Sequence, residues 1–187
     1  MRISGGTARG ITLVVPRGDA VRPATDGMRQ ALFSSLGARV VEAHFLDLFA
    51  GSGGYGLEAL SRGAAGGVFV EQNAKAVACI RQNIAAVCKS LRRDESGLRV
   101  VQADARTVPT GEFVPDLVFI DPPYDLIPDL VDLLFERLTM LLVSQPEALV
   151  CFEAPGEIDL SPAGWTLVKR IGKGARQPTV SVFRKGG

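Results

Sequence analysis

The sequence predicts an α/β protein with a mostly parallel sheet and helices on both faces of that sheet. Short apolar runs alternate with helix-length amphipathic segments between residues 44 and 153, which is the pattern of βαβ units. A glycine-rich loop joins the first of these runs to the next helical segment, as in many open sheets that bind a ligand there. The last two apolar runs have no helix between them, so the sheet should finish with an antiparallel hairpin.

The same periodicities locate the individual elements. Strands are expected at residues 44–49, 67–71, 98–102, 114–120, 148–153, 165–171 and 179–184. Helices are expected at residues 25–36, 54–61, 74–91 and 128–142. The first helix should begin at Thr25 or Asp26, because either side chain can cap it, and it should end before Gly37.

The N-terminal residues are expected to form a separate basic extension. Two short β-prone runs, residues 2–4 and 11–15, are separated by glycines, which indicates a small hairpin outside the large core. We therefore expect residues 1–24 to form the extension and residues 25–187 to form the main domain. A chain of 187 residues is long enough for that domain to have a core of its own.

Composition argues against several classes of protein. No apolar stretch approaches the roughly 20 residues that span a bilayer, and the N-terminus lacks the apolar core of a signal peptide. Cys79, Cys88 and Cys151 have no metal-binding spacing, and His44 is the only histidine. The cysteine spacing and the single histidine therefore argue against a disulfide framework, a metal site and a histidine triad. We expect a cytoplasmic monomer with buried cysteines and no metal.

The formal net charge of +1 conceals an uneven distribution. Residues 1–39 contain six arginines and two acids, whereas residues 169–187 contain six basic residues and no acid. The segment between them is correspondingly acidic. If the fold brings the two ends to one face, they provide a cationic surface for phosphate groups.

The glycine-rich loop follows the strand expected at residues 44–49. Gly51, Gly53 and Gly56 fit the GxGxxG pattern, which lets a ligand approach the free amides at the start of the next helix. Glu71 ends the following strand, where a carboxylate can accept hydrogen bonds from ribose hydroxyls. These features fit NAD and S-adenosylmethionine equally well.

A stiff turn, Asp121-Pro122-Pro123-Tyr124, follows the apolar run that ends at Ile120. Each proline fixes its φ near about −65°, and Asp121 is restricted to extended geometry because it precedes a proline. Its carboxylate could accept hydrogen bonds from an amino group while the ring of Tyr124 stacks on a flat ligand. The turn is therefore expected to hold a nucleobase that carries an exocyclic amine.

Two further acids favour the sulfonium cofactor. Asp47 lies near the exit of the first strand, where it could bind a cationic amino group, and Asp104 follows the third strand, where it could bind an adenine amino group. A methyl donor beside an amine-binding turn predicts methyl transfer to that amine. Acceptance of the amine hydrogens by Asp121 and by the Pro122 carbonyl would direct the nitrogen lone pair at the methyl group.

Together these motifs resemble the class I S-adenosylmethionine methyltransferases, and more narrowly the RsmD family, which methylates N2 of a guanine in 16S ribosomal RNA. The resemblance extends from the Arg2-Ile3-Ser4-Gly5-Gly6 start to the proline turn. It implies a Rossmann-like sheet of seven strands in the order 3-2-1-4-5-7-6. Members commonly carry a Tyr-Gly pair where this chain has residues 175–178, and they often have Glu where Gln30 stands.

The resemblance also implies a set of site residues and a partner, which is ribosomal RNA or the small ribosomal subunit particle. S-adenosyl-L-methionine would be bound by Asp47, Phe49, Ala50, Gly51, Ser52, Gly53, Glu71, Gln72, Asp104 and Ala105. The catalytic turn would consist of Asp121, Pro122, Pro123 and Tyr124. RNA would be bound by Arg2, Arg9, Arg22, Thr25 and Arg29.

Three other functions stay open on the sequence alone. An adenine-N6 methyltransferase acting on DNA or RNA would use the same amine chemistry at the turn. An NAD-dependent dehydrogenase would use the glycine loop and Glu71, but it would leave the proline turn and the basic ends unexplained. A non-catalytic RNA-binding module would use the basic ends alone.

Overall fold

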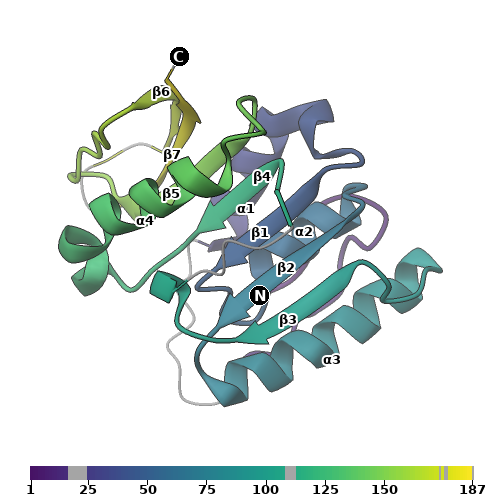
Figure 1. Cartoon of the computed structure of the whole chain (residues 1–187). Helices are drawn as coiled ribbons and strands as arrows, with labels where there is room; N and C mark the ends of the chain where they lie inside the picture. The colour runs from purple at the N-terminus through teal and green to yellow at the C-terminus, as the bar shows by residue number, and fades with distance from the viewer. Residues whose placement is uncertain (17–24, 108–112, 173, 175–176, 187) are drawn as a thin grey trace.

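A seven-stranded sheet forms the centre of the computed structural model, which describes residues 1–16, 25–107, 113–172, 174 and 177–186 (Figure 1). The strand order is β3-β2-β1-β4-β5-β7-β6, so the expected order is confirmed. The strands are β1 (His44–Leu48), β2 (Gly66–Glu71), β3 (Leu98–Gln102), β4 (Leu117–Ile120), β5 (Leu149–Pro155), β6 (Trp165–Ile171) and β7 (Pro178–Lys185).

Strands β1 to β5 pair in parallel, whereas β7 lies antiparallel between β5 and β6. The antiparallel hairpin expected at the end of the sheet is therefore confirmed. The strand order reverses between β1 and β4, which are neighbours in the sheet although β2 and β3 separate them in the chain. In open α/β sheets the carboxyl ends of the strands at such a reversal form a crevice that binds ligands.

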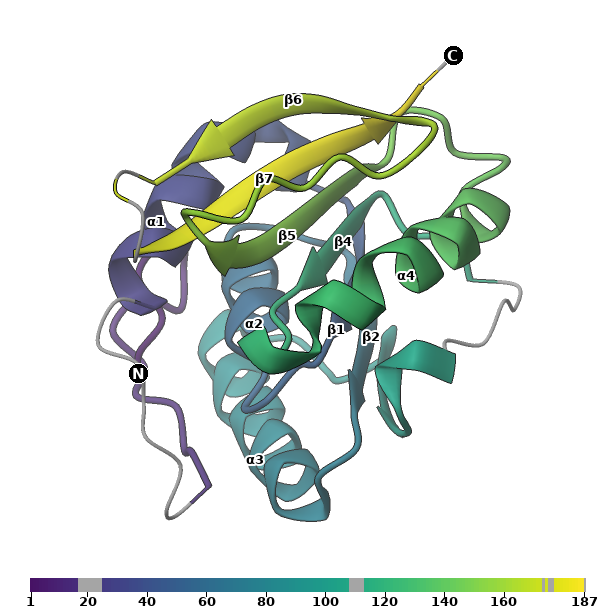
Figure 2. The same ribbon diagram turned by 90° about the vertical axis from the view of Figure 1, so that its left-hand side faces the viewer.

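Within the described part of the chain, four α-helices cover the sheet unevenly (Figure 2). They are α1 (Thr25–Leu36), α2 (Gly54–Ser61), α3 (Ala74–Leu91) and α4 (Ile127–Leu141). Helices α1, α2 and α3 pack on one face and α4 packs on the other. Local signals explain where they begin and end: Asn73 Oδ1 accepts from the amides of Lys75 and Ala76 at the start of α3, and α1 ends at Leu36 before Gly37.

The central strands contribute alternate residues to two cores. Phe45, Phe69 and Phe119 face α1, α2 and α3 in the first core, whereas Leu48 and Ile120 face α4 in the second core. A strand that is buried on both faces requires a mostly apolar sequence, and these strands have it apart from Asp47 in β1. The three cysteines are buried, as expected.

The N-terminal segment, residues 1–16, corrects one expectation. The two β-prone runs pair antiparallel as a small hairpin, through a bridge between Arg2 and Thr12 and hydrogen bonds from the Ile3 amide to the Ile11 carbonyl at 2.9 Å and from the Leu13 amide to the Met1 carbonyl at 3.0 Å, but this hairpin does not lie outside the large core. It packs against the first core, because Ile3 and Leu13 point inward and are buried there. The domain boundary expected after residue 24 falls beside residues 17–24, outside the described part of the chain, and stays a prediction.

Two strand boundaries also differ from expectation. β1 ends at Leu48 because Phe49 has a φ of 57°, a left-handed conformation that starts the glycine loop. β4 begins at Leu117 and not at residue 114, since Pro115 has no amide hydrogen for a sheet hydrogen bond. None of the described helices is both long and apolar enough to cross a bilayer.

Candidate active site

Four carboxylates lie at the carboxyl ends of four adjacent strands, and we call them the carboxylate row. Asp47 lies in β1, Glu71 ends β2, Asp121 directly follows β4, and Glu153 lies near the end of β5. Their neighbours along each strand belong to the second core, so strand alternation directs all four acids to the face covered by α1, α2 and α3. Among the described residues, no group of three His, Cys, Asp or Glu side chains could hold a metal ion.

Asp47 lies at the strand-order reversal and is buried, with 2% of its surface exposed. Its Oδ2 accepts a hydrogen bond from the Gly56 amide at 2.9 Å. Burial raises the pKa of Asp47 well above its usual value, and the nearby charges of Asp121 and Glu71 raise it further, while the Gly56 hydrogen bond and Arg29 act in the opposite direction. The site therefore favours a bound cation.

The glycine loop is held against the carboxylate row by its backbone. The Gly51 amide donates to Glu71 Oε2 at 2.8 Å, and both Gly51 and Gly53 have positive φ values, of 56° and 85°, which glycine adopts without strain. A Cβ atom added to Gly51 would meet nothing within 4 Å, whereas one added to Gly56 would lie 2.4 Å from the Phe69 ring. Gly51 thus leaves open space for a ligand, and Gly56 lets α2 pack closely on the sheet.

This arrangement is unfavourable for a dinucleotide pyrophosphate. Dinucleotide sites use free helix-terminal amides to bind phosphate, but the amides of Gly51 and Gly56 donate to protein carboxylates here. Neither of these two amides is therefore free for a ligand. A phosphate would also approach the negative charges of Asp47, Glu71 and Asp121, whereas sulfonium and ammonium groups would be attracted by them.

The other expected cofactor residues lie around the ends of β1, β2 and β3. Phe49, Ala50 and Ser52 form the loop itself, Gln72 is exposed next to Glu71, and Ala105 is buried in the second core. Asp104 forms a local ion pair in which Arg106 Nη2 lies 2.6 Å from Asp104 Oδ2. The hydrogen bond from Arg106 lowers the pKa of Asp104. A contact between Asp104 and an adenine amino group stays a prediction.

Asn83, in α3, connects the glycine loop to the N-terminal segment, and sequence reasoning missed it. Only 1% of its surface is exposed. Its Nδ2 donates to the carbonyls of Ser52 and Val14, both at 2.9 Å, and its Oδ1 accepts from the Val14 amide at 2.8 Å. The hydroxyl of Ser52 also contacts Met1 Sδ at 3.9 Å. The one sequence signal for this role was that Asn83 is a polar residue within the apolar stripe of an amphipathic helix.

The proline turn lies beside Asp47. Asp121 is half-buried, Pro122 is buried, Pro123 is exposed, and Tyr124 begins a short 3-10 helix, Tyr124–Leu126. Asp47 is the register partner of Phe119 in β4, two residues before Asp121, and the charge of Asp121 raises the pKa of both Asp47 and Tyr55. The ring of Tyr124 packs against the second core. The fold thus brings the turn and the glycine loop together at the reversal of strand order.

Tyr55 and Glu153 form a buried pair next to this turn, which sequence reasoning also missed. The Tyr55 hydroxyl donates to Glu153 Oε2, and the Tyr55 ring stacks on Phe119 with centroids 5.5 Å apart. Burial raises the pKa of Tyr55 well above its usual value, and the charges of Glu153 and Asp121 add to this effect. Tyr55 therefore stays protonated. A glutamate inside the apolar run of β5 was the signal that could have indicated this pair.

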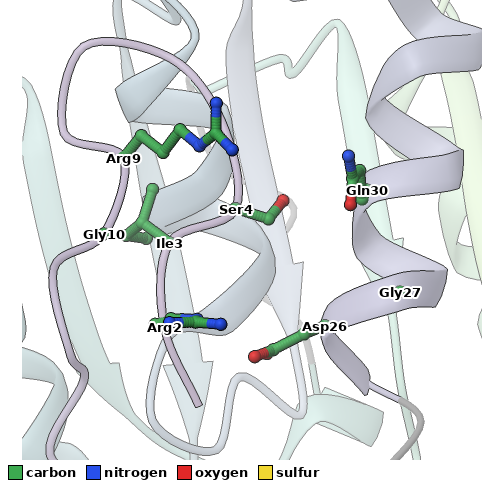
Figure 3. Close-up of a pocket in the computed structure, with 8 residues that line it drawn as sticks. All are labelled: Arg2, Ile3, Ser4, Arg9, Gly10, Asp26, Gly27 and Gln30. Atoms are coloured by element: carbon green, nitrogen blue, oxygen red, sulfur yellow. The ribbon is translucent and has the colours of Figure 1, made fainter.

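The expected RNA-binding residues differ in how exposed they are and in whether the structure describes them. Arg2 and Arg9 are exposed on the N-terminal segment (Figure 3). Arg22 lies outside the described residues, and Thr25 begins α1, where its side chain is likewise outside the described part. Arg29, in contrast, is buried.

Arg29 is an internal residue, and its expected contact with RNA is wrong. Only 2% of its surface is exposed. Its Nη2 donates to Asp26 Oδ1 at 2.7 Å and to the Arg2 carbonyl at 2.6 Å, and its Nε lies 3.6 Å from Glu58 Oε2. Because Glu58 in α2 is completely buried, an internal cation is needed beside it. Arg29 therefore neutralises buried acids between α1, α2 and the N-terminal segment.

A family model described as conserved hypothetical protein 95, which corresponds to the RsmD family, matches residues 1–181. The chain belongs to this family. It is similar to the RsmD-family protein of Escherichia coli strain K12 named ribosomal RNA small subunit methyltransferase D, with 36% identity over 172 residues that cover 89% of this chain and 82% of the relative.

Solved structures agree with the family assignment. The Escherichia coli protein yhhF superposes with a TM-score of 0.79 at 30% identity, over 100% of this chain and 98% of that one. The ribosomal protein L11 methylase of Lactobacillus delbrueckii subsp. bulgaricus shares the fold alone, with a TM-score of 0.65 at 11% identity over 90% and 81% of the two chains. The RsmD-family chain therefore has the Rossmann-like class I methyltransferase fold.

Proposed function

We propose that this protein transfers the methyl group of S-adenosyl-L-methionine to the exocyclic N2 amine of a guanine in 16S ribosomal RNA. The observation that carries the proposal is the carboxylate row around the glycine loop, with Asp121 of the proline turn beside Asp47. A cluster of carboxylates next to an amine-accepting turn suits a cationic methyl donor and an amine substrate. The names of the curated relatives support ribosomal RNA of the small subunit as the substrate.

The residues of the glycine loop fit the cofactor. Gly51 leaves open space above the loop, Glu71 offers carboxylate oxygens to ribose hydroxyls, and Asp47 offers a negative charge to the cationic groups. When bound, the cofactor supplies a methyl group on a positively charged sulfur. Asp47 and Glu71 already accept hydrogen bonds from the Gly56 and Gly51 amides, and these bonds hold the glycine loop in its conformation before the cofactor binds.

The proline turn would act on the amine. An exocyclic amine is a weak nucleophile because its lone pair is delocalised into the base. Acceptance of its hydrogens by Asp121 and the Pro122 carbonyl would favour a pyramidal nitrogen whose lone pair points at the methyl group. Tyr124 would stack on the base after the base leaves its helix or loop. The transfer would be in line, without a covalent enzyme intermediate: the bond from the amine nitrogen to the methyl carbon would form as the bond from sulfur to that carbon breaks, S-adenosyl-L-homocysteine would leave, and Asp121 would accept the proton released by the methylated amine.

Mass spectrometry of ribosomal RNA from cells with and without the gene tests this proposal. We expect one N2-methylguanosine to be absent from the 16S RNA of cells that lack the gene. Purified protein and labelled S-adenosyl-L-methionine should then restore the modification, on naked RNA or on small-subunit particles. A missing N6-methyladenosine would support the adenine-N6 alternative instead, and an unchanged nucleoside profile would contradict both.

We expect Asp47→Asn to make the protein more stable at neutral pH and to weaken cofactor binding. The folded state raises the pKa of Asp47 above the unfolded value of about 3.9. Stability is therefore lost as pH rises from the unfolded pKa through the raised folded pKa, because the buried side chain must ionise. Asparagine avoids this loss and can still accept from the Gly56 amide.

Urea unfolding at several pH values and calorimetry with S-adenosyl-L-methionine would measure both effects. The stability difference between variant and wild type should vanish below about pH 4 and be complete above the raised pKa. Asp132→Asn, on the exposed side of α4, is the matched control and should change neither quantity. Unchanged cofactor affinity in Asp47→Asn would remove Asp47 from the cofactor site.

A further inference from the structure

We propose that Tyr55 is a positioning residue for methyl transfer, whose hydroxyl fixes the glycine loop relative to the proline turn. This inference rests on the proposed function, and Tyr55 lies outside every set of site residues expected from the sequence. Tyr55 is the second residue of α2, so it follows the glycine loop closely. Its hydroxyl donates to Glu153 in β5, the strand next to the one that leads into the proline turn.

The first turn of α2 connects three strands that lie side by side in the sheet, β1, β4 and β5. The Gly56 amide donates to Asp47 in β1 at 2.9 Å, and the hydroxyl of the preceding residue, Tyr55, donates to Glu153 in β5. Between these two contacts, the Tyr55 ring stacks on Phe119 in β4, with centroids 5.5 Å apart and planes 15° apart. Two consecutive residues of α2 therefore bind all three strands.

Asp121 lies next to the contact that Tyr55 makes. In the register of β4 with β5, the last paired residues directly precede Asp121 and Glu153, so the two acids are the next residues along neighbouring strands. Asp121 also follows Phe119 by two positions, which directs both side chains to the same face. The acid that would accept the amine hydrogens is thus a neighbour of the acid that Tyr55 binds.

Packing alone does not require the hydroxyl of Tyr55. Its ring lies in the first core, between Phe33 at a centroid distance of 6.5 Å and Phe119. A phenylalanine ring would fill this space equally well, and a buried hydroxyl beside a buried carboxylate costs free energy unless the two groups are bonded. A hydrogen bond defines the distance between its two atoms narrowly, so this pair sets the spacing between α2 and β5.

The Tyr55 hydroxyl stays a donor at neutral pH. Burial raises the pKa of Tyr55 well above its usual value, and the charges of Glu153 and Asp121 raise it further, while Arg29 acts in the opposite direction. A protonated phenol beside a carboxylate forms a charge-assisted hydrogen bond, which is roughly twice as strong as a bond between neutral groups. The connection between α2 and β5 is therefore a durable one.

Methyl transfer depends on the spacing that this connection sets. The amine nitrogen at Asp121 and the methyl carbon of a cofactor on the glycine loop would have to approach in line, at about 3–3.5 Å, and a misplacement of about 1 Å can cost about 10²-fold in rate. Tyr55 belongs to the helix that follows the loop, and Glu153 belongs to the strand beside the turn. Their hydrogen bond would therefore hold the two reacting groups in register.

Steady-state kinetics of Tyr55→Phe, with 16S ribosomal RNA or small-subunit particles and labelled S-adenosyl-L-methionine, tests the proposal. The variant keeps the ring and loses only the hydroxyl. We expect kcat to fall about 10-fold, because the reacting groups are less well aligned. KM for RNA and the dissociation constant of the cofactor should stay close to the wild-type values, because a buried hydroxyl would contact neither ligand.

Thr139→Val is the matched control, because it also removes one hydrogen bond between side chains. Thr139 lies in the last turn of α4, where its hydroxyl accepts from Trp165 Nε1 at 3.0 Å. This variant should have a lower melting temperature and an unchanged kcat. An equal fall of kcat in Thr139→Val and Tyr55→Phe would show that lost stability, and not lost alignment, lowers the rate, and it would overturn the proposal.

Glu153→Gln gives a second measurement, because glutamine keeps an oxygen that can accept from the Tyr55 hydroxyl. Its kcat should fall less than that of Tyr55→Phe at an unchanged KM, and the double variant should have the kcat of Tyr55→Phe alone. Losses that multiply in the double variant would mean that the two side chains act independently and would overturn the proposal. If Tyr55→Phe does not fold, Glu153→Gln decides alone, and a wild-type kcat in it would overturn the proposal.

The wild-type protein separates a failure of this proposal from a failure of the proposed function. If wild type methylates a guanine and Tyr55→Phe has the same kcat, Tyr55 does not position the turn and the proposed function stands. If wild type methylates no guanine, the proposed function fails, and the role of Tyr55 fails with it.

Discussion

Asp121→Ala is expected to lower kcat for methyl transfer by about 10²–10³-fold and to change the dissociation constant of S-adenosyl-L-methionine only a few-fold. The reason is that Asp121 would accept a hydrogen of the target amine during the reaction, whereas the cofactor would lie on the glycine loop and beside Asp47. Initial rates with labelled cofactor and calorimetry of cofactor binding measure the two quantities separately.

Two further variants sharpen this prediction. Asp121→Asn keeps one acceptor oxygen without the charge, so its kcat should lie between those of wild type and Asp121→Ala. Asp132→Asn, far from the site on α4, should retain full activity. An equal loss of turnover and cofactor affinity in Asp121→Ala would mean that Asp121 belongs to the cofactor pocket and does not act on the amine.

Arg29→Ala is expected to reduce the free energy of unfolding by about 3–5 kcal/mol, because it leaves the buried carboxylate of Glu58 without one of its cations. It also removes the donor to Asp26 and to the Arg2 carbonyl. Urea unfolding monitored by circular dichroism would measure the change. The N-terminal segment should loosen at the same time and become sensitive to proteolysis.

Arg62→Ala is the matched control, since Arg62 Nε also binds Glu58, at 2.8 Å, but its side chain is 20% exposed. Partial solvation makes such a pair weaker, so the loss should be clearly smaller. A double variant that adds Glu58→Gln to Arg29→Ala should recover part of the stability, because the buried charge is gone. An Arg29→Ala protein of normal stability and reduced RNA affinity would restore the original assignment of Arg29 to RNA.

The contrast between Arg29 and Arg9 illustrates the limit of sequence reasoning at this site. Both are arginines in the basic first part of the chain, and their charge alone does not separate them. Arg9 is exposed, whereas Arg29 is buried because the packing of α1 against α2 places Glu58 beside it. An excess of basic residues in the sequence gives a cationic surface only where the packing leaves those residues exposed to solvent.

The glycine loop shows a similar division. Its position after β1 and before α2 could be predicted, because strand periodicity and glycine spacing are local properties. The hydrogen-bond partners of its amides could not be predicted. The Gly51 amide donates to Glu71 and the Gly56 amide donates to Asp47, so two protein carboxylates occupy amides that were expected to bind an anionic ligand. Whether these amides reach Glu71 and Asp47 depends on distances between segments that come together only when the chain folds.

By itself the sequence determined the alternation of strands and helices, the ends of α1 and α3, and the positions of the loop and the proline turn at strand ends. These properties follow from backbone preferences and apolar spacing within a few residues. Family resemblance supplied the strand order.

Only the tertiary structure decided that acids from four strands face one side, that Tyr55 reaches Glu153 across 98 residues, and that the N-terminal segment completes the first core. Burial and charge interactions arise between segments that meet only after folding, and no local pattern encodes their distances.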